Sequence, residues 1–335
     1  MRKIDIFNHV TPKAYARKVE EIAGAPKDLG KRTRAVTLLH DLDARFRVMD
    51  RFDDYSQVIT IPGPQPGNIA EPNRSPELAR AGNDGLAELV RAHPDRFVAF
   101  AATLPMNNPD AAVAEAERAI RDLGAKGIEV FTNVRGKPLD LPEYLPLWQL
   151  MSRYDLPIWV HPSRSPAQTD YASESRSRFE IWFAFGYPYE TAAAMSRIVF
   201  AGLFDKFPNL KFITHHMAGI VPFQEGRIVA GWAQLGSRTS DEDYTAVVGS
   251  LARPLNEYFK MFYADTAMFG ARAGTACGVD YFGADHVVFA SDMPFDPQPG
   301  QFIADTIRVI DSLDLSETDR AKIYFRNAEK LLKLS

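Results

Sequence analysis

The sequence predicts a (β/α)₈ barrel, in which eight parallel strands are each followed by helical sequence. Three observations predict this fold. Short β-branched or aromatic runs alternate with amphipathic segments along the chain. No glycine-rich phosphate turn follows any of these runs, which disfavours an open nucleotide-binding sheet with the same alternation. Ionisable side chains stand at the ends of several runs, where a parallel barrel carries its active site. Barrels of this kind reach 335 residues as one unit, so we expect a single domain over residues 1–335.

The expected strands are short apolar runs rich in β-branched or aromatic residues. In chain order they are Ile4–Phe7, Gln57–Ile61, Phe97–Ala101, Gly127–Phe131, Pro157–His161, Lys211–Thr214, Met261–Ala264 and His286–Ala290.

Amphipathic helices connect these strands, most clearly at Pro76–Ala92, Pro109–Leu123, Pro142–Tyr154 and Tyr189–Phe204. Asn108 is a suitable N-cap because Pro109 then takes the first helical position. Two stretches, roughly residues 22–45 and 163–187, interrupt the alternation of strands and helices and are expected to be long irregular loops. The second follows the fifth strand, so it should hang over the C-terminal mouth of the barrel.

Composition narrows the class of function. The net charge is −4 with both signs scattered, which predicts neither a nucleic-acid nor a membrane partner. No apolar run approaches the roughly 18–20 residues that span a bilayer, and the first residues are too polar for a secretory signal. Cys277 is the single cysteine, so a disulfide framework and a thiolate metal site are excluded. We therefore expect a cytoplasmic protein.

The strand ends carry the candidate chemistry, because polar residues there point into the mouth of a parallel barrel. The residues at these positions are His9, Glu129, His161, His215, His216, Asp265 and Asp292. Imidazole and carboxylate groups suit Zn²⁺ or a similar divalent ion, and a catalytic site needs about three such ligands with one open position. Each histidine alone would more often be a packing residue, but their shared position on one rim favours a metal site.

Three of these assignments stay open from the residues alone. His215 and His216 are adjacent, so on a strand only one of them can face the mouth, and periodicity does not choose between them. Glu129 is read as a hydrogen-bonded carboxylate of the barrel interior, with a place in the site as the alternative. Asp265 is read as a cap of the seventh strand, with the orientation of a metal ligand as the alternative.

Several motifs together give a resemblance that runs nearly end to end. They are Lys3–Ile6 with His9, the 45–50 segment, Ile158–Pro162, Gly202 and Phe204 through Pro208, His216 with Gly219, Pro222–Phe223, Gly226–Arg227, Tyr263–Ala267 and Phe289–Phe295. The chain resembles the amidohydrolase-related family that contains aminocarboxymuconate-semialdehyde decarboxylase and the resorcylate and dihydroxybenzoate decarboxylases. The Ser291–Phe295 segment, in register with His161 and His216, is the specific part of this signal.

The resemblance implies a set of metal ligands and one departure from it. It implies His161 and Asp292 as ligands, and its register places His216 rather than His215 in the site. The His-x-His of the first strand is Phe7-Asn8-His9 here, so one expected ligand is missing. His9, His161 and Asp292 still reach the number of ligands that a catalytic metal needs. We expect one divalent metal, zinc first and manganese or iron next, with a metal-free enzyme as the alternative.

These residues predict a metal-dependent, non-oxidative decarboxylase of an aromatic or unsaturated enol-type acid. The metal would hold a substrate oxygen, and His216 or Asp292 would carry the proton to carbon. Arginine is the natural partner of a carboxylate, and Arg32, Arg34, Arg45 and Arg164 lie in suitable regions. Of these, Arg45 and Arg164 are predicted to bind the substrate. Trp182 is predicted to join them as a wall of an aromatic pocket, together with Phe183, Phe185 and Tyr187.

Two other readings remain. A metal-dependent hydrolase or hydratase, acting on a lactone, an amide, a C–C bond or an unsaturated acid, would use nearly the same residues. A barrel without catalytic activity is the third reading, which the retained His161, His216 and Asp292 disfavour. The resemblance further implies a homodimer that acts on a small-molecule carboxylic acid.

Overall fold

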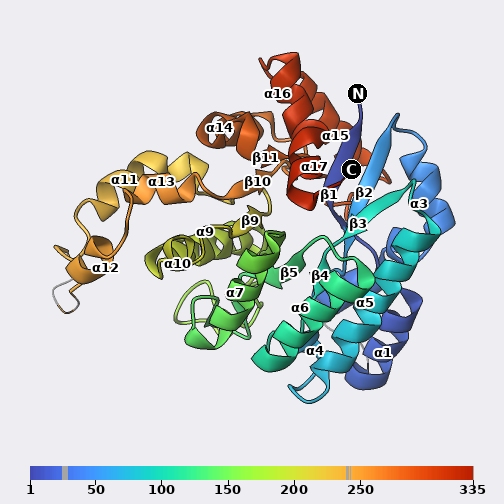
Figure 1. Cartoon of the computed structure of the whole chain (residues 1–335), viewed down its shortest axis with the longest axis horizontal. Coiled ribbons are helices and arrows are strands. Elements are labelled where there is room, and N and C mark those ends of the chain that lie inside the picture. The colour runs from blue at the N-terminus through green and yellow to red at the C-terminus, as the bar shows by residue number, and fades with distance from the viewer. Residues whose placement is uncertain (25–28, 239–240, 242, 335) are drawn as a thin grey trace.

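The computed structural model describes residues 1–24, 29–238, 241 and 243–334 and shows a mixed α/β protein whose strands lie among surrounding helices (Figure 1). The predicted α/β class with parallel strands is confirmed. The strands are β1 (Lys3–His9), β2 (Tyr55–Thr60), β3 (Phe97–Phe100), β4 (Ala102–Thr103), β5 (Ile128–Phe131), β8 (Pro157–His161), β9 (Lys211–Thr214), β10 (Tyr263–Asp265) and β11 (Val287–Val288), with a small antiparallel hairpin of β6 (Asn133–Val134) and β7 (Lys137–Pro138).

The strands form two parallel sheets that share one stretch of chain. The first sheet has the order β1-β2-β3 and the second has the order β11-β10-β9-β8-β5-β4. Only Ala101 separates β3 from β4, so this stretch pairs with β2 on one side and with β5 on the other. The outer edges are also joined, because Ile6 N donates to Phe289 O and His9 N donates to Met293 O, both at 2.9 Å. The carboxyl ends of strands remote in sequence therefore lie close together.

The helices follow the strands in alternation, as expected. They are α1 (Lys13–Ala23), α2 (Leu29–Ala35), η1 (Thr37–Leu39), α3 (Leu42–Met49), α4 (Pro66–Ile69), α5 (Ser75–Ala92), α6 (Pro109–Leu123), η2 (Pro142–Tyr144), α7 (Leu145–Tyr154), α8 (Ile181–Ala184), α9 (Gly186–Phe200), α10 (Leu203–Lys206), η3 (Pro222–Gln224), α11 (Glu225–Trp232), α12 (Thr245–Gly249), α13 (Leu255–Phe259), α14 (Arg272–Phe282), η4 (Ala284–His286), α15 (Gln301–Asp311), α16 (Glu317–Ala321), η5 (Lys322–Arg326) and α17 (Asn327–Leu332).

Local sequence explains where several helices begin and end. The Asn108 side chain accepts a hydrogen bond from Ala111 N at 3.2 Å, which confirms the predicted N-cap of α6. The predicted helix Tyr189–Phe204 is instead two helices, α9 and α10. The break falls at Gly202, whose φ of +65° favours glycine. The expectation of a long loop over residues 22–45 is wrong in part, because α2, η1 and the start of α3 lie there.

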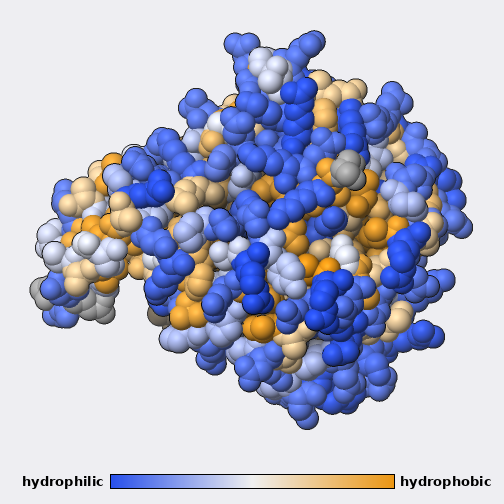
Figure 2. All heavy atoms as spheres, viewed as in Figure 1, coloured by the Kyte–Doolittle hydropathy of each residue, from blue (hydrophilic) through white to orange (hydrophobic). Residues whose placement is uncertain are grey.

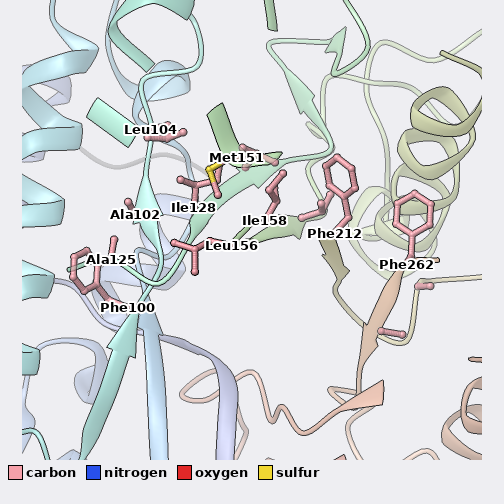
Figure 3. Packing of buried hydrophobic residues seen from close by; sticks show 14 of the residues in the cluster. Phe100, Ala102, Leu104, Ala125, Ile128, Met151, Leu156, Ile158, Phe212 and Phe262 are labelled. Carbon is pink, nitrogen blue, oxygen red and sulfur yellow. The ribbon is translucent and has the colours of Figure 1, made fainter. Parts of the chain in front are cut away.

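Two apolar cores lie on either side of the strands. The larger one packs strand residues against the covering helices; Figure 3 shows Ile128 and Ile158 beside Met151 of α7. The smaller one lies on the opposite face of the strands and includes Ile6, Trp159 and Ile213, all fully buried. Trp159 Nε1 donates to Ile6 O at 2.8 Å and so ties β8 to β1 across this core. This rigid interior supports the polar side chains at the strand ends.

The two chain ends lie close together, because Arg2 and Glu329 form an ion pair at 2.6 Å. The segment carrying α11, α12 and α13 projects from the body of the protein (Figure 1), and neither α11 nor α12 contains a buried residue. Apolar residues are exposed on the projecting segment (Figure 2). Within the described residues, no helix is both long and apolar enough to span a membrane.

Candidate active site

Strand register brings a cluster of histidines to one rim. Trp159 on β8 pairs with Ile213 on β9, and both side chains lie in the smaller core. Because side chains alternate along a strand, His161 and His215, each two residues further on, face the same side. His9 ends β1 and joins them, with ring centroids 5.5 Å from His161 and 6.5 Å from His215. The ligand atoms of these three histidines all lie within 4.8 Å of one another.

Asp292 faces this cluster from the segment after β11, where its backbone has a φ of +61°. Its Oδ1 lies 3.1 Å from His9 Nε2 and 3.5 Å from His215 Nε2, while its Oδ2 lies 3.7 Å from His216 Nε2. One carboxylate oxygen therefore serves the histidine cluster, and the other faces a fourth imidazole. The left-handed backbone of a non-glycine residue is strained, as is common where a side chain must be aimed at a functional site.

Each clustered histidine has its Nδ1 occupied, which directs Nε2 inward. His215 Nδ1 donates to Asp265 Oδ2 at 2.5 Å, and His161 Nδ1 donates to Pro162 O at 2.7 Å. His9 Nδ1 lies 2.9 Å from the Thr60 hydroxyl, which accepts the hydrogen bond when Nε2 carries the lone pair. Carboxylate or carbonyl acceptors behind the ring are the usual support of a metal-binding histidine.

The ionisation of the cluster follows from burial and from the mutual contacts. Burial lowers the pKa of His9 and brings that of His161 well below its ordinary value. His215 is also fully buried, which lowers its pKa, but the carboxylates of Asp265 and Asp292 outweigh this and raise the pKa to about 10. Burial raises the pKa of Asp292, yet its contacts with His215, His216 and His9 hold it well below the ordinary value. Asp292 is therefore a carboxylate at neutral pH.

The cluster fits one divalent cation. His215 Nε2 is buried and makes no hydrogen bond in the described part of the chain, although it lies within ion-pair distance of Asp292 Oδ1. In a tetrahedral site with bonds of about 2.1 Å, two ligand atoms are about 3.4 Å apart. The distances of 3.1 and 3.5 Å from Asp292 Oδ1 to His9 and His215 bracket this value. His9 and His161, whose pKa values are lowered, offer neutral imidazoles and Asp292 offers a carboxylate, which are the donor types that such an ion requires. His215 would release its proton on binding the ion.

The expectation that His216 and not His215 enters the site needs correction, because the structure brings both histidines to Asp292. The alternation along β9 extends to His215 but not to His216, because the strand ends at Thr214 and the backbone changes at His216. His216 has a φ of +54°, so it lies in a left-handed turn that redirects its ring. Gly219 completes this turn at a φ of +62°, where a Cβ would lie 2.5 Å from Pro188 O.

A cavity of about 210 Å³ opens above the cluster. Its polar lining includes His161, His216, Asp292 and Arg32, and its aromatic lining consists of Phe183, Tyr187, Phe269, Phe295 and Phe302. This volume is below the roughly 300 Å³ at which pockets for drug-sized ligands begin. The cavity therefore suits a single small ring.

Arg32 is the basic residue that reaches this cavity. Its guanidinium lies over the rings of Phe183 and Phe295, at 5.4 and 5.0 Å from their centroids, and donates to Phe295 O at 3.2 Å. The sequence put Arg32 among four candidates but did not select it. Its place on a helix within an expected irregular loop gave no signal that could have distinguished it.

The three predicted substrate-binding residues lie outside this cavity. Arg45 is fully buried, and its guanidinium donates to Gln57 Oε1, His9 O and Leu38 O. It supports the end of β1, so the prediction of substrate binding is not met by its position. Arg164 is paired with Glu190 at 2.9 Å. Trp182 packs behind the cavity wall, with ring centroids 5.9 Å from Phe183 and 5.8 Å from Tyr187.

The aromatic residues predicted beside Trp182 divide into two groups. Phe183 and Tyr187 line the cavity, whereas Phe185 is 75% exposed and is not part of the lining. Phe7 lies inside the cluster, fully buried, with its ring centroid 4.1 Å from that of His215. It contributes no ligand atom and fills the space beside the imidazoles.

The two acids left open by the sequence are now placed. Asp265 orients a histidine of the cluster: besides His215, it accepts from His216 N and Ala267 N, each at 3.0 Å. Glu129 lies in the interior beside Trp159 on the neighbouring strand. Neither of its carboxylate oxygens makes a hydrogen bond of good geometry among the described residues, although Thr60 and His215 lie near enough to lower its pKa. Burial raises the pKa of Glu129 to about 8, which keeps it protonated at neutral pH.

Comparisons with known proteins agree with this arrangement. The amidohydrolase family model matches residues 4–334. The chain is 33% identical over 305 residues to a gamma-resorcylate decarboxylase of Polaromonas sp., covering 89% of each protein. It is 28% identical over 352 residues to a 2-amino-3-carboxymuconate-6-semialdehyde decarboxylase of Dictyostelium discoideum, covering 99% of this chain and 92% of that protein.

A solved structure adds information about ligands. A dihydroxybenzoic acid decarboxylase from Polaromonas sp. JS666, with bound manganese and the inhibitor 2-nitroresorcinol, superposes with a TM-score of 0.77 at 28% identity. The alignment covers 99% of this chain and 97% of that one. That relative therefore holds a metal ion and an aromatic ligand within the same fold.

Proposed function

Because the chain belongs to the amidohydrolase family, we propose that it is a metal-dependent, non-oxidative decarboxylase of a small aromatic or enol-type carboxylic acid. One observation carries this proposal: a buried cluster suited to a divalent ion opens into an aromatic cavity with an arginine at its rim. The activities of the named relatives agree with the carboxy-lyase class predicted from the sequence.

The proposed ligands are His9, His161 and Asp292: His9 and His161 share one group of neighbouring ligand atoms, and Asp292 Oδ1 lies 3.1 Å from His9 Nε2. When bound, the ion supplies a Lewis acid that holds a phenolic, enolic or carboxylate oxygen of the substrate. Zinc is the proposed ion because imidazole donors dominate the set. Manganese, which the Polaromonas structure holds, is the alternative that metal analysis distinguishes.

The reaction needs a proton at carbon and a route for CO₂ to leave. The proton adds to the ring carbon that bears the carboxylate. The C–C bond then breaks, its electron pair stays on the ring, and CO₂ departs without any oxidant. His216 is placed to deliver this proton, since it lines the cavity and its Nε2 faces Asp292 Oδ2 at 3.7 Å. Asp292 would hold the imidazole in position and stabilise its protonated form.

Arg32 is the proposed partner of a substrate anionic oxygen, in place of Arg45 and Arg164. A guanidinium binds a carboxylate with two parallel hydrogen bonds, which fixes the orientation of a flat ring. The rings of Phe183 and Phe295 already hold this guanidinium at the cavity. Phe269 and Phe302 on the opposite elements would cover the ring and exclude water.

The direct test is CO₂ release from a panel of hydroxybenzoates, measured on purified protein with stoichiometric metal. Release from at least one ortho-hydroxylated acid, together with the matching phenol, is the expected result. If no acid in the panel yields CO₂ and a panel of lactones or unsaturated acids is hydrolysed or hydrated, the hydrolase or hydratase reading replaces this one.

The same proposal includes one closed (β/α)₈ barrel formed as a single domain over residues 1–335. The run of chain from β3 into β4 and the backbone bonds from β1 to Phe289 and Met293 support closure. The proposal also includes long segments over the mouth of the barrel. Arg32 and Phe183 favour this, because they come from the two stretches predicted as loops and both line the cavity.

We also propose a cytoplasmic homodimer. The single cysteine favours a reducing compartment. The dimer is supported by apolar exposure along α9, η3 and α11, where Tyr189 is 57%, Phe223 is 80% and Val229 is 47% exposed. Exposed apolar patches of this kind mark protein interfaces. Light scattering coupled to size exclusion should give twice the mass of the chain.

A further inference from the structure

We propose that His215 is a fourth ligand of the bound ion, so that the ligand sphere consists of three imidazoles and one carboxylate. This inference rests on the metal dependence proposed above, and it adds a residue that neither the strand pattern nor the resemblance selected. Four observations about the side chain carry it.

The first observation concerns the inward-facing nitrogen. His215 is fully buried, and its Nε2 makes an ion-pair contact with Asp292 but no hydrogen bond in the described part of the chain. Buried polar atoms usually make a hydrogen bond, so an atom that makes only such a contact is a candidate for completion by an ion. This atom lies 3.5 Å from Asp292 Oδ1 and faces the cluster, so a shared ion would satisfy both groups.

The second observation is the support behind the ring. Asp265 is fully buried, and its Oδ2 accepts from His215 Nδ1 at 2.5 Å. Its Oδ1 accepts from the backbone nitrogens of His216 and Ala267, which fixes the carboxylate in place. A carboxylate that accepts from Nδ1 leaves Nε2 as the metal donor and raises its basicity.

The third observation is that His215 belongs to both groups of neighbouring ligand atoms in the cluster. The cluster contains two groups of ligand atoms close enough to hold an ion, namely His9 with His161 and His215, and His215 with His216 and Asp292. His215 is the residue common to both. An ion bound by His9 and His161 therefore has His215 Nε2 within reach, and the same nitrogen lies 3.5 Å from Asp292 Oδ1.

The fourth observation concerns the neighbouring strand. On β1, His9 supplies one donor, but Phe7 on the same strand supplies none. The Phe7 ring lies 4.1 Å from that of His215 and 5.4 and 5.9 Å from those of His9 and His161. His215, just after β9, therefore provides a nitrogen donor beside Phe7, a position on β1 that provides none.

The test measures the affinity of zinc for the purified full-length protein by competition with a chromophoric chelator. His215→Gln should lower this affinity at least about 100-fold, more than the 10–100-fold typical of a residue that only supports a ligand. His216→Gln is the matched control, because it changes the adjacent imidazole on the same turn, and it should lower the affinity less than about tenfold. The double variant Phe7→His with His215→Gln should recover at least about tenfold over His215→Gln, since an imidazole then returns to the cluster.

The outcomes separate this inference from the proposed function. If the wild-type protein binds zinc tightly and the His215→Gln variant binds it equally well, the assignment of His215 is overturned. The proposed metal-dependent function is then unaffected. Wild-type protein that binds no divalent ion overturns both. If His215→Gln does not fold, X-ray absorption of the zinc-loaded wild-type protein decides, because three imidazoles per ion are expected and two would refute the assignment.

Discussion

Arg32 provides the sharpest prediction about substrate recognition. Replacing it with glutamine removes the guanidinium at the cavity and keeps a side chain of similar length. A hydrogen bond to a charged group contributes about 1.5–3 kcal/mol. Arg32 is exposed at the rim of the cavity, so solvent screening favours the lower end of this range. About 1.5 kcal/mol corresponds to a loss of roughly tenfold in the affinity for an aromatic carboxylate.

The assay is calorimetric titration of the metal-loaded protein with a hydroxybenzoate or an unreactive nitrophenol analogue. Arg34→Gln is the matched control, because Arg34 lies on the same helix, is 63% exposed and pairs with Glu20 at 3.2 Å. The control should change the dissociation constant less than about twofold. The nitrophenol, which lacks a carboxylate, should lose less affinity than the acid on Arg32→Gln.

Two results would refute this reasoning. Equal dissociation constants for the wild type and Arg32→Gln would remove Arg32 from the site. An equal loss in Arg32→Gln and Arg34→Gln would show that only the general positive charge of α2 (Leu29–Ala35) matters.

Three further predictions concern other groups of the site. His216→Gln should lower kcat by about 10²–10⁴-fold with bound metal unchanged, measured by CO₂ release and metal analysis; an unaltered kcat would exclude it as proton donor. Arg45→Met should lower the free energy of unfolding by about 2–4 kcal/mol in urea, because buried acceptors lose their donor; a raised KM with unchanged stability would restore the role in substrate binding. Burial raises the pKa of Glu129 to about 8 from 4.5, so its stabilising protonated form is fully present below pH 4.5 and is lost as the pH rises through 8. Glu129→Gln should therefore match the wild type near pH 4.5 and be about 3–5 kcal/mol more stable at pH 9 in metal-free protein, and equal stability at pH 9 would contradict this.

Much of the fold was predictable because strands and amphipathic helices each impose a characteristic spacing of apolar residues on the sequence. Pro157–His161, Lys211–Thr214 and Pro109–Leu123 have the predicted bounds. The position of polar residues at strand ends predicted the residues that gather at this rim, where His9 and His161 lie together and Asp292 lies 3.1 Å from His9.

The rest of the site depends on geometry beyond any strand. His216 reaches Asp292 through a left-handed turn, a backbone state that the alternation of side chains does not predict. The burial of Arg45 could not be predicted, because it depends on acceptors from Gln57 and from two backbone carbonyls that no local sequence pattern indicates. Arg32 gains its place through tertiary packing of α2 against aromatic rings from distant segments.

The central claim is that carbon–carbon bond cleavage depends on one ion held among His9, His161 and Asp292. The most direct measurement plots the initial rate of CO₂ release per chain against bound metal per chain, with zinc or manganese returned stepwise to chelator-treated protein. The account predicts a line that rises from zero and levels off at one ion per chain. A rate that is already maximal without metal would contradict it.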